Sequence, residues 1–161
     1  MHPSIETVGQ LYQTTDGLYQ KALTGLDPDM ALRRPGEQSN SVAWIAGHLA
    51  WTRSRLCGLL GVPVEFPWSD VFARGARPPE PEELPSLVEV RQAWQTISAR
   101  LMTRLDELTE AELAAPAARP MPIADRSLRG SIVFLAYHEG YHIGQLSFLR
   151  KWMGLPGLVD G

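Results

Sequence analysis

The histidines are the residues of this chain with the clearest capacity for chemistry. His138 and His142 lie four residues apart in the run H-E-G-Y-H, and His48 lies far upstream in an apolar segment. On an α-helix a spacing of four residues places both imidazoles on one face, one turn apart, where they can bind the same divalent ion. The fourth histidine, His2, stands next to the first residue and is not included. The pattern predicts a metal site formed by His48, His138 and His142.

A three-histidine site has a characteristic chemistry. Neutral imidazole is a good ligand for zinc, nickel, copper or iron, and three protein ligands leave coordination positions open for water or a substrate atom. Open positions are typical of catalytic rather than structural metal sites. The alternative for each histidine is an interior imidazole that is hydrogen-bonded to a neighbour.

Glu139 follows the first histidine of the pair, so the run also matches H-E-x-x-H, the zinc-protease motif in which the glutamate is the general base. Those proteases take a third ligand from downstream, whereas the nineteen residues after His142 contain no histidine and only one acidic residue, Asp160. The sequence therefore disfavours a protease. Glu139 is the candidate catalytic base, and a carboxylate that supports a ligand or lies at the surface is the alternative that we favour.

Other polar and aromatic residues accompany the predicted site. Arg55 shares the His48 side of its segment and can bind an anionic substrate group, although a side chain that extends to solvent explains it better. Cys57, the only cysteine, lies on the side opposite His48 and outside the site. Five aromatic residues flank the histidines and can line an apolar pocket, although we expect at least two simply to pack: Trp44, Trp51, Phe134, Tyr141 and Trp152.

Length and composition limit the function classes. A chain of 161 residues fits one domain with its own hydrophobic core, and a single cysteine excludes an intrachain disulfide. The formal net charge of -3 argues against nucleic acid as a partner. The opening residues lack a basic and apolar leader, and no apolar run reaches the roughly 18 residues of a membrane span. We expect a cytoplasmic protein that binds neither nucleic acid nor membrane.

Four long segments with helical periodicity must position the histidines. We expect them at about 4–24, from the 39–41 cluster of capping residues to about 60, at 86–108, and at 127–153. The inward face of the last segment holds apolar residues and both histidines, which we expect to point into a bundle: Leu128, Leu135, His138, His142, Leu146, Leu149 and Trp152.

The connections between the long segments are unequal in length. Short helical turns are predicted after Asp27 and after Thr109, because both residues can cap a helix. Residues 61–85 contain six of the thirteen prolines and are expected to be irregular. One short connection and one long crossover imply that not every neighbouring pair of helices is antiparallel.

Two motifs make the chain similar to a known family. The stretch N-S-V-A-W-I-A-G-H-L-A at 40–50, followed by H-E-G-Y-H-I-G-Q at 138–145, resembles the DinB-like superfamily, also called DinB/YfiT-like metalloenzymes. The resemblance implies a single all-α domain over 1–161, a four-helix bundle in an up-down-down-up arrangement, often as a homodimer. It also implies a divalent metal on His48, His138 and His142, most often nickel or zinc, with iron and manganese as alternatives.

The activity that this resemblance implies is thiol chemistry. Family members with assigned activities are similar to thiol S-transferases or isomerases that use a low-molecular-weight thiol such as bacillithiol or mycothiol. We therefore expect a metal-dependent enzyme that acts on a small molecule, thiol S-transferase-like or hydrolase-like. The alternatives are a metal-binding sensor or interaction bundle without catalysis, and a structural bundle whose histidines complete a polar core network.

Overall fold

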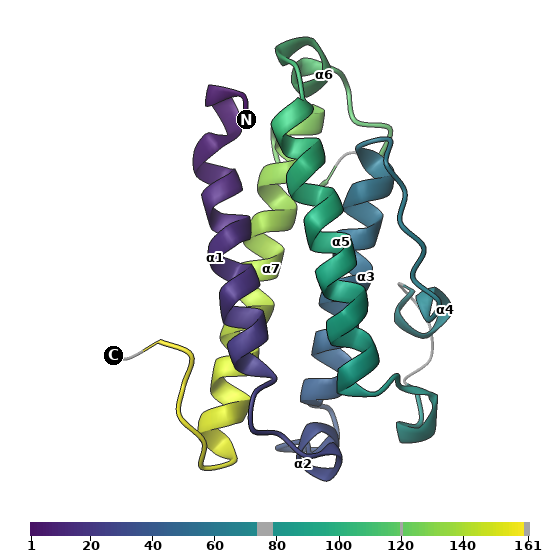
Figure 1. Cartoon of the computed structure of the whole chain (residues 1–161), viewed down its shortest axis with the longest axis vertical. Coiled ribbons are helices and arrows are strands. Elements are labelled where there is room, and N and C mark those ends of the chain that lie inside the picture. The colour runs from purple at the N-terminus through teal and green to yellow at the C-terminus, as the bar shows by residue number, and fades with distance from the viewer. Residues whose placement is uncertain (74–78, 120, 160–161) are drawn as a thin grey trace.

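Four long helices dominate the structure, a computed structural model that describes residues 1–73, 79–119 and 121–159. They are α1 (Glu6–Ala22), α3 (Val42–Leu59), α5 (Leu87–Glu107) and α7 (Leu128–Trp152), and no strand is formed by the described residues. In Figure 1, α1 and α7 run in one direction while α3 and α5 run in the other. The all-α fold and the up-down-down-up order predicted from the sequence are therefore confirmed.

The helix ends follow the predicted capping chemistry. Ser41 accepts a hydrogen bond from the Trp44 backbone N–H at the start of α3, and Ser127 accepts one from Gly130 at the start of α7. A reciprocal capping box of Ser86 and Glu89 begins α5. These caps satisfy backbone donors that a helix leaves unpaired, and they mark where α3, α5 and α7 begin.

Short helical turns connect the long helices. The predicted turns are present as α2 (Pro28–Leu32) and α6 (Glu110–Ala114), with η1 (Pro3–Ile5) before α1. The crossover after α3 is less irregular than predicted, because it contains α4 (Ser69–Phe72) and η2 (Pro81–Glu83). Phe66 and Phe72 are buried, so apolar packing orders this proline-rich stretch. Positions 74–78 of the predicted irregular stretch lie outside the described residues.

The core is continuous along the bundle and includes large aromatic residues. Tyr19 and Trp94 stack with ring centroids 3.8 Å apart, and both are fully buried. The Tyr12 and Tyr19 hydroxyls donate to the backbone carbonyls of Ile132 and Ala46, so these buried polar groups are satisfied. In the described part of the chain, no helix combines the length and the apolarity that crossing a bilayer requires.

Trp152, the last residue of the predicted inward face of α7, is exposed. Trp152 is 39% exposed, and its ring lies beneath the Arg33 guanidinium, 5.0 Å from the ring centroid. It is the last residue of α7. The predicted inward orientation of Trp152 was therefore wrong.

Candidate metal centre

The three predicted histidines come together where α3 and α7 pack. His48 comes from the middle of α3, and His138 and His142 come from successive turns of α7. The Nε2 atoms of His48 and His138 are 3.4 Å apart, and those of His138 and His142 are 3.2 Å apart. One ligand nitrogen from each ring lies within 4.8 Å of both others. The rings are half-buried or buried in the seam between the helices rather than at the centre of the bundle.

The spacing of these nitrogens fits a divalent ion. With metal–nitrogen bonds of about 2.0 to 2.1 Å, adjacent ligand nitrogens are about 3.4 Å apart in a tetrahedron and about 3.0 Å apart at right angles. Both nitrogen pairs that include His138 lie within this range or at its edge. Three lone pairs at such distances repel one another unless a proton or a cation lies between them, so the donor set fits a metal.

Burial keeps the imidazoles in the form that binds metal. Burial, together with the other two histidines, lowers the pKa of His48 from 6.5 to about 3. Burial and the nearby His142 lower the pKa of His138 to about 4. The pKa of His142 is also lowered by burial, an effect that its bond to Gln145 opposes. All three rings therefore offer neutral nitrogens at neutral pH.

Aromatic side chains surround the histidines. Trp44 stacks on the His48 ring with centroids 4.8 Å apart, and Trp51 tilts against the same ring at 5.7 Å. Tyr141 meets the edge of His142 at 5.2 Å. These contacts confirm that aromatic residues flank the cluster, and they restrict the rotation of two of its rings. Phe134 packs against Tyr137, a neighbour on the same helix.

Glu139 points away from the histidine seam and into the bundle. It is only 3% exposed, and the Arg53 guanidinium holds both of its oxygens, with Nε 2.8 Å from Oε2 and Nη2 2.6 Å from Oε1. The Thr15 hydroxyl donates to Oε1 as well. Because ion pairing and hydrogen bonding engage the carboxylate fully, these contacts describe a residue that ties α7 to α3 and α1. A catalytic role for Glu139 stays a prediction.

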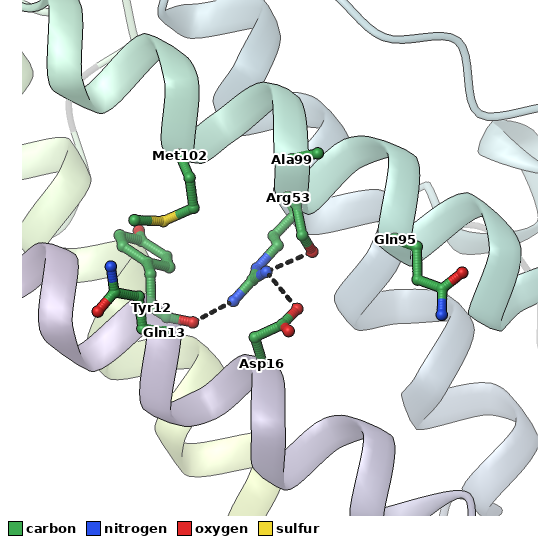
Figure 2. Close-up of a pocket in the computed structure, with 8 residues that line it drawn as sticks. Tyr12, Gln13, Asp16, Arg53, Gln95, Ala99 and Met102 are labelled. Atoms are coloured by element: carbon green, nitrogen blue, oxygen red, sulfur yellow. Dashed lines mark hydrogen bonds and ion pairs between the residues drawn. The ribbon is translucent and has the colours of Figure 1, made fainter.

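Arg53 connects this ion pair to a pocket on another side of the bundle. Its Nη1 atom donates to Asp16 Oδ1 at 3.3 Å and to Ser98 Oγ at 2.5 Å. Figure 2 shows the guanidinium at the floor of the pocket, between α1 and α5. The pocket has a volume of about 350 Å³, and eight residues line it: Tyr12, Gln13, Asp16, Arg53, Gln95, Ser98, Ala99 and Met102.

Sequence reasoning missed Arg53 and singled out Arg55. Arg53 is 1% exposed and stacks on Trp94 with its guanidinium carbon 3.8 Å from the ring centroid, whereas Arg55 is exposed. A signal was present in the sequence, because Arg53 lies four residues after Leu49 and three before Leu56, on the apolar stripe of its helix. An arginine on such a stripe predicts a buried acidic partner. Cys57 is buried, with its sulfur 3.8 Å from the Ile97 carbonyl.

Comparisons with known proteins identify the family and the fold of the chain. Residues 10–146 match the model of the DinB superfamily. No curated protein matches the sequence. Among solved structures, a conserved protein from Enterococcus faecalis superposes with a TM-score of 0.73 at 16% identity, covering 94% of this chain and 97% of its own.

A second solved structure is similar over the same extent. YfiT from Bacillus subtilis, described as a probable metal-dependent hydrolase with an unusual four-helix bundle topology, superposes with a TM-score of 0.67 at 12% identity. The match covers 96% of this chain and 91% of YfiT. At these identities the superpositions establish the fold, while the sequence match, which spans most of the chain, establishes the family: the chain belongs to the DinB superfamily.

Proposed function

We propose that this protein is a metal-dependent enzyme that acts on a small molecule, with His48, His138 and His142 as the metal ligands. The observation that carries the proposal is the convergence of three neutral imidazoles, with Nε2 atoms 3.2 to 3.4 Å apart in two of the pairs. Three protein ligands leave positions open for a substrate. The hydrolase description of YfiT supports the same class of activity.

The proposed ion is zinc or nickel. Three nitrogen donors favour these ions over manganese, which binds more weakly to nitrogen and prefers oxygen ligands, and iron is a further alternative. When bound, such an ion supplies Lewis acidity, which lowers the pKa of a coordinated water or thiol. The chain itself holds the three lone pairs in place and keeps them unprotonated by burial.

The proposed reaction is thiol transfer or hydrolysis on a small molecule. A low-molecular-weight thiol must supply the sulfur for thiol transfer, because Cys57 is fully buried and burial raises the pKa of its thiol to about 11. Trp51 and Tyr141 beside the histidines offer apolar surface for the body of a substrate. Thiol transfer by a sulfur nucleophile and hydrolysis by water therefore both require an open coordination position on the metal beside aromatic side chains.

The proposal is tested first by metal content. The protein is purified without a histidine tag, and bound metal is measured in the His48→Ala, His138→Ala and His142→Ala variants. His2→Ala is the matched control, because His2 lies at the other end of the chain and bonds Ser4. We expect near-stoichiometric metal in the wild type and the control and a strong loss in each of the other three. Full occupancy in all three would refute the site.

The second test is activity. The metal-loaded protein is assayed for conjugation of a low-molecular-weight thiol to electrophiles and for hydrolysis of a panel of esters and amides. Turnover that the three alanine variants lose would support the enzyme. Metal binding without turnover in either reaction would favour the non-catalytic alternative, a metal-binding sensor or interaction bundle.

A homodimer is proposed as the assembly. Five large apolar residues on the outer face of α7 are 36 to 69% exposed: Val133, Tyr137, Tyr141, Phe148 and Trp152. At roughly 200 Å² for each aromatic side chain, the four aromatic residues expose on the order of 450 Å², more than half of the contribution of one partner to a standard interface. Sedimentation of the wild type and of the Tyr137→Glu/Phe148→Glu variant tests the dimer. A monomeric wild type would refute it.

A further inference from the structure

His142 differs from the other two histidines in the contacts of its outer nitrogen. Its Nδ1 atom lies 2.7 Å from Gln145 Oε1, and the Nε2 atom of the same amide donates to the Tyr141 hydroxyl at 3.1 Å. Spacings of three and four residues on α7 bring the three side chains to one face of the helix. The outer nitrogens of His48 and His138 are buried and have no partner among the described residues.

The directions of these hydrogen bonds depend on one another. An imidazole whose Nε2 lone pair faces the cluster carries its proton on Nδ1 and must donate from there. Gln145 can accept that proton only with Oε1, which leaves its NH₂ group to donate elsewhere. The Tyr141 hydroxyl accepts from that group, and a reversed amide would place an N–H against the Nδ1–H of His142.

We propose that Gln145, oriented by Tyr141, is a positioning residue that fixes His142 in the tautomer whose Nε2 lone pair faces the other two histidines. This inference rests on the proposed metal site and deepens it. His142 is the ligand that the protein prepares before an ion arrives. His48 and His138 are held by ring packing and by their place in the seam, and no side chain among the described residues bonds their outer nitrogens.

Zinc affinity of side-chain variants tests the inference. Partners of the outer nitrogen change metal affinity by about 10- to 100-fold when they are removed. We therefore expect the Gln145→Met variant, which keeps the size of the side chain but has no strong acceptor, to bind zinc 10- to 100-fold more weakly. Gln145→Glu keeps an acceptor at the same place and should bind zinc at least as tightly as the wild type.

Tyr141→Phe provides an intermediate case. It keeps the aromatic ring beside His142 but removes the acceptor that orients the amide, so we expect a loss of zinc affinity smaller than that of Gln145→Met. Gln20→Met is the matched control, because Gln20 is a half-buried glutamine on the outer part of α1. Its zinc affinity should equal that of the wild type. All variants are titrated with zinc against a chromophoric chelator at about pH 8, where imidazole with an ordinary pKa of about 6.5 is neutral.

A second measurement separates this inference from the proposed function. The ¹⁵N chemical shifts of the His142 ring in the metal-free protein report which nitrogen carries the proton. We expect Nδ1–H in the wild type and a mixture of tautomers in Gln145→Met, with melting temperatures of the metal-free variants equal to that of Gln20→Met. Nε2–H in the wild type, unchanged zinc affinity in Gln145→Met, or equal losses in Gln145→Glu and Gln145→Met would each overturn the inference. If the wild type binds no zinc, the proposed function fails, while the dependence of the tautomer on Gln145 still decides the inference.

Discussion

Replacing Arg53 by methionine should destabilise the protein more than most substitutions in the bundle. Methionine keeps the length and much of the apolar contact of the arginine side chain, including its packing on Trp94. It removes both bonds to Glu139 and leaves that carboxylate buried, with Thr15 as its remaining donor. It also removes the bonds that the guanidinium donates to Asp16, Ser98 and the Tyr12 carbonyl, so the substitution tests the whole polar network of Arg53 while much of its packing is kept.

The magnitude follows from burial at both ends of the pair. Arg53 is 1% exposed and Glu139 is 3% exposed, so solvent does not replace the lost partner. Breaking such a pair on one side costs about 3 to 5 kcal/mol. For a protein of 161 residues this loss corresponds to a decrease of the melting temperature of about 6 to 20 °C. From a stability of about 5 to 15 kcal/mol this loss leaves about 0 to 12 kcal/mol, so at the low end the variant is only marginally folded at room temperature.

The assay is a double-mutant cycle. Urea unfolding followed by circular dichroism is measured for the wild type, Arg53→Met, Glu139→Leu and the variant with both changes. Glu139→Leu leaves the buried guanidinium with Asp16, which is 40% exposed, as its remaining acidic partner, and should cost up to about 3 to 5 kcal/mol. The double variant leaves no unpaired buried charge, and Asp16 keeps its bond from the Trp94 indole at 2.7 Å. We expect it to lie within about 2 kcal/mol of the wild type.

The cycle has a clear refuting result. A coupling free energy of at least about 3 kcal/mol between the two positions is expected, because Arg53→Met leaves the buried carboxylate without its ionic partner and Glu139→Leu leaves the buried guanidinium with only the partly exposed Asp16. If Arg53→Met costs less than about 1 kcal/mol, or if the two single effects simply add, the pair is not the buried, mutually dependent unit described by its contacts. The reasoning about the bundle centre would then be wrong.

Three further predictions concern pH, packing and metal. Burial lowers the pKa of His48 to about 3 and that of His138 to about 4, so on acidification these histidines take up protons first in the unfolded chain. The free energy of unfolding of the metal-free protein should therefore fall as the pH decreases from about 6.5 to 4. Measured by urea unfolding, this decrease with pH should be smaller in His138→Ala. A methyl group at Gly47 would overlap the Phe72 ring, so Gly47→Ala should destabilise by about 1 to 3 kcal/mol, whereas Gly58→Ala in open space on the same helix should stabilise by about 0.5 to 1 kcal/mol. Zinc at 100 times its Kd should raise the melting temperature by about 5 to 11 °C, reversed by a chelator.

Local signals in the sequence predicted the helices and the residues of the cluster. Capping residues such as Ser41 and Ser127 place the helix starts, and the spacing of His138 and His142 defines one helical face. The unequal lengths of the connections predicted that not every neighbouring pair of helices is antiparallel, as Figure 1 shows. These features depend on residues that are close in the sequence, so they can be predicted without tertiary information.

Features that depend on the rotation of one helix against another were not predictable in this way. Glu139 lies about 100° around α7 from His138, and this rotation decides whether the carboxylate or the imidazole faces the bundle centre. The sequence analysis expected the histidines to point inward, whereas the structure places them in the seam and gives the centre to Glu139 and Arg53. The pairing of Arg53 with Glu139, 86 positions apart, sets this rotation, because a buried arginine needs a buried acid.

The ion pair and the histidine cluster fix the same two helices. Arg53 lies five residues after His48 on α3, and Glu139 directly follows His138 on α7, so a rotation of either helix that separates the imidazoles also strains the pair. A buried ion pair of this kind adds little to net stability. Our hypothesis is that this pair instead selects one relative rotation of α3 and α7. The double variant of the cycle separates the two contributions. It should unfold with a stability near that of the wild type but bind zinc more weakly, because an apolar contact between the same positions tolerates several rotations of α7 against α3. Equal zinc affinity in the double variant and the wild type would show that packing alone sets the position of the histidines.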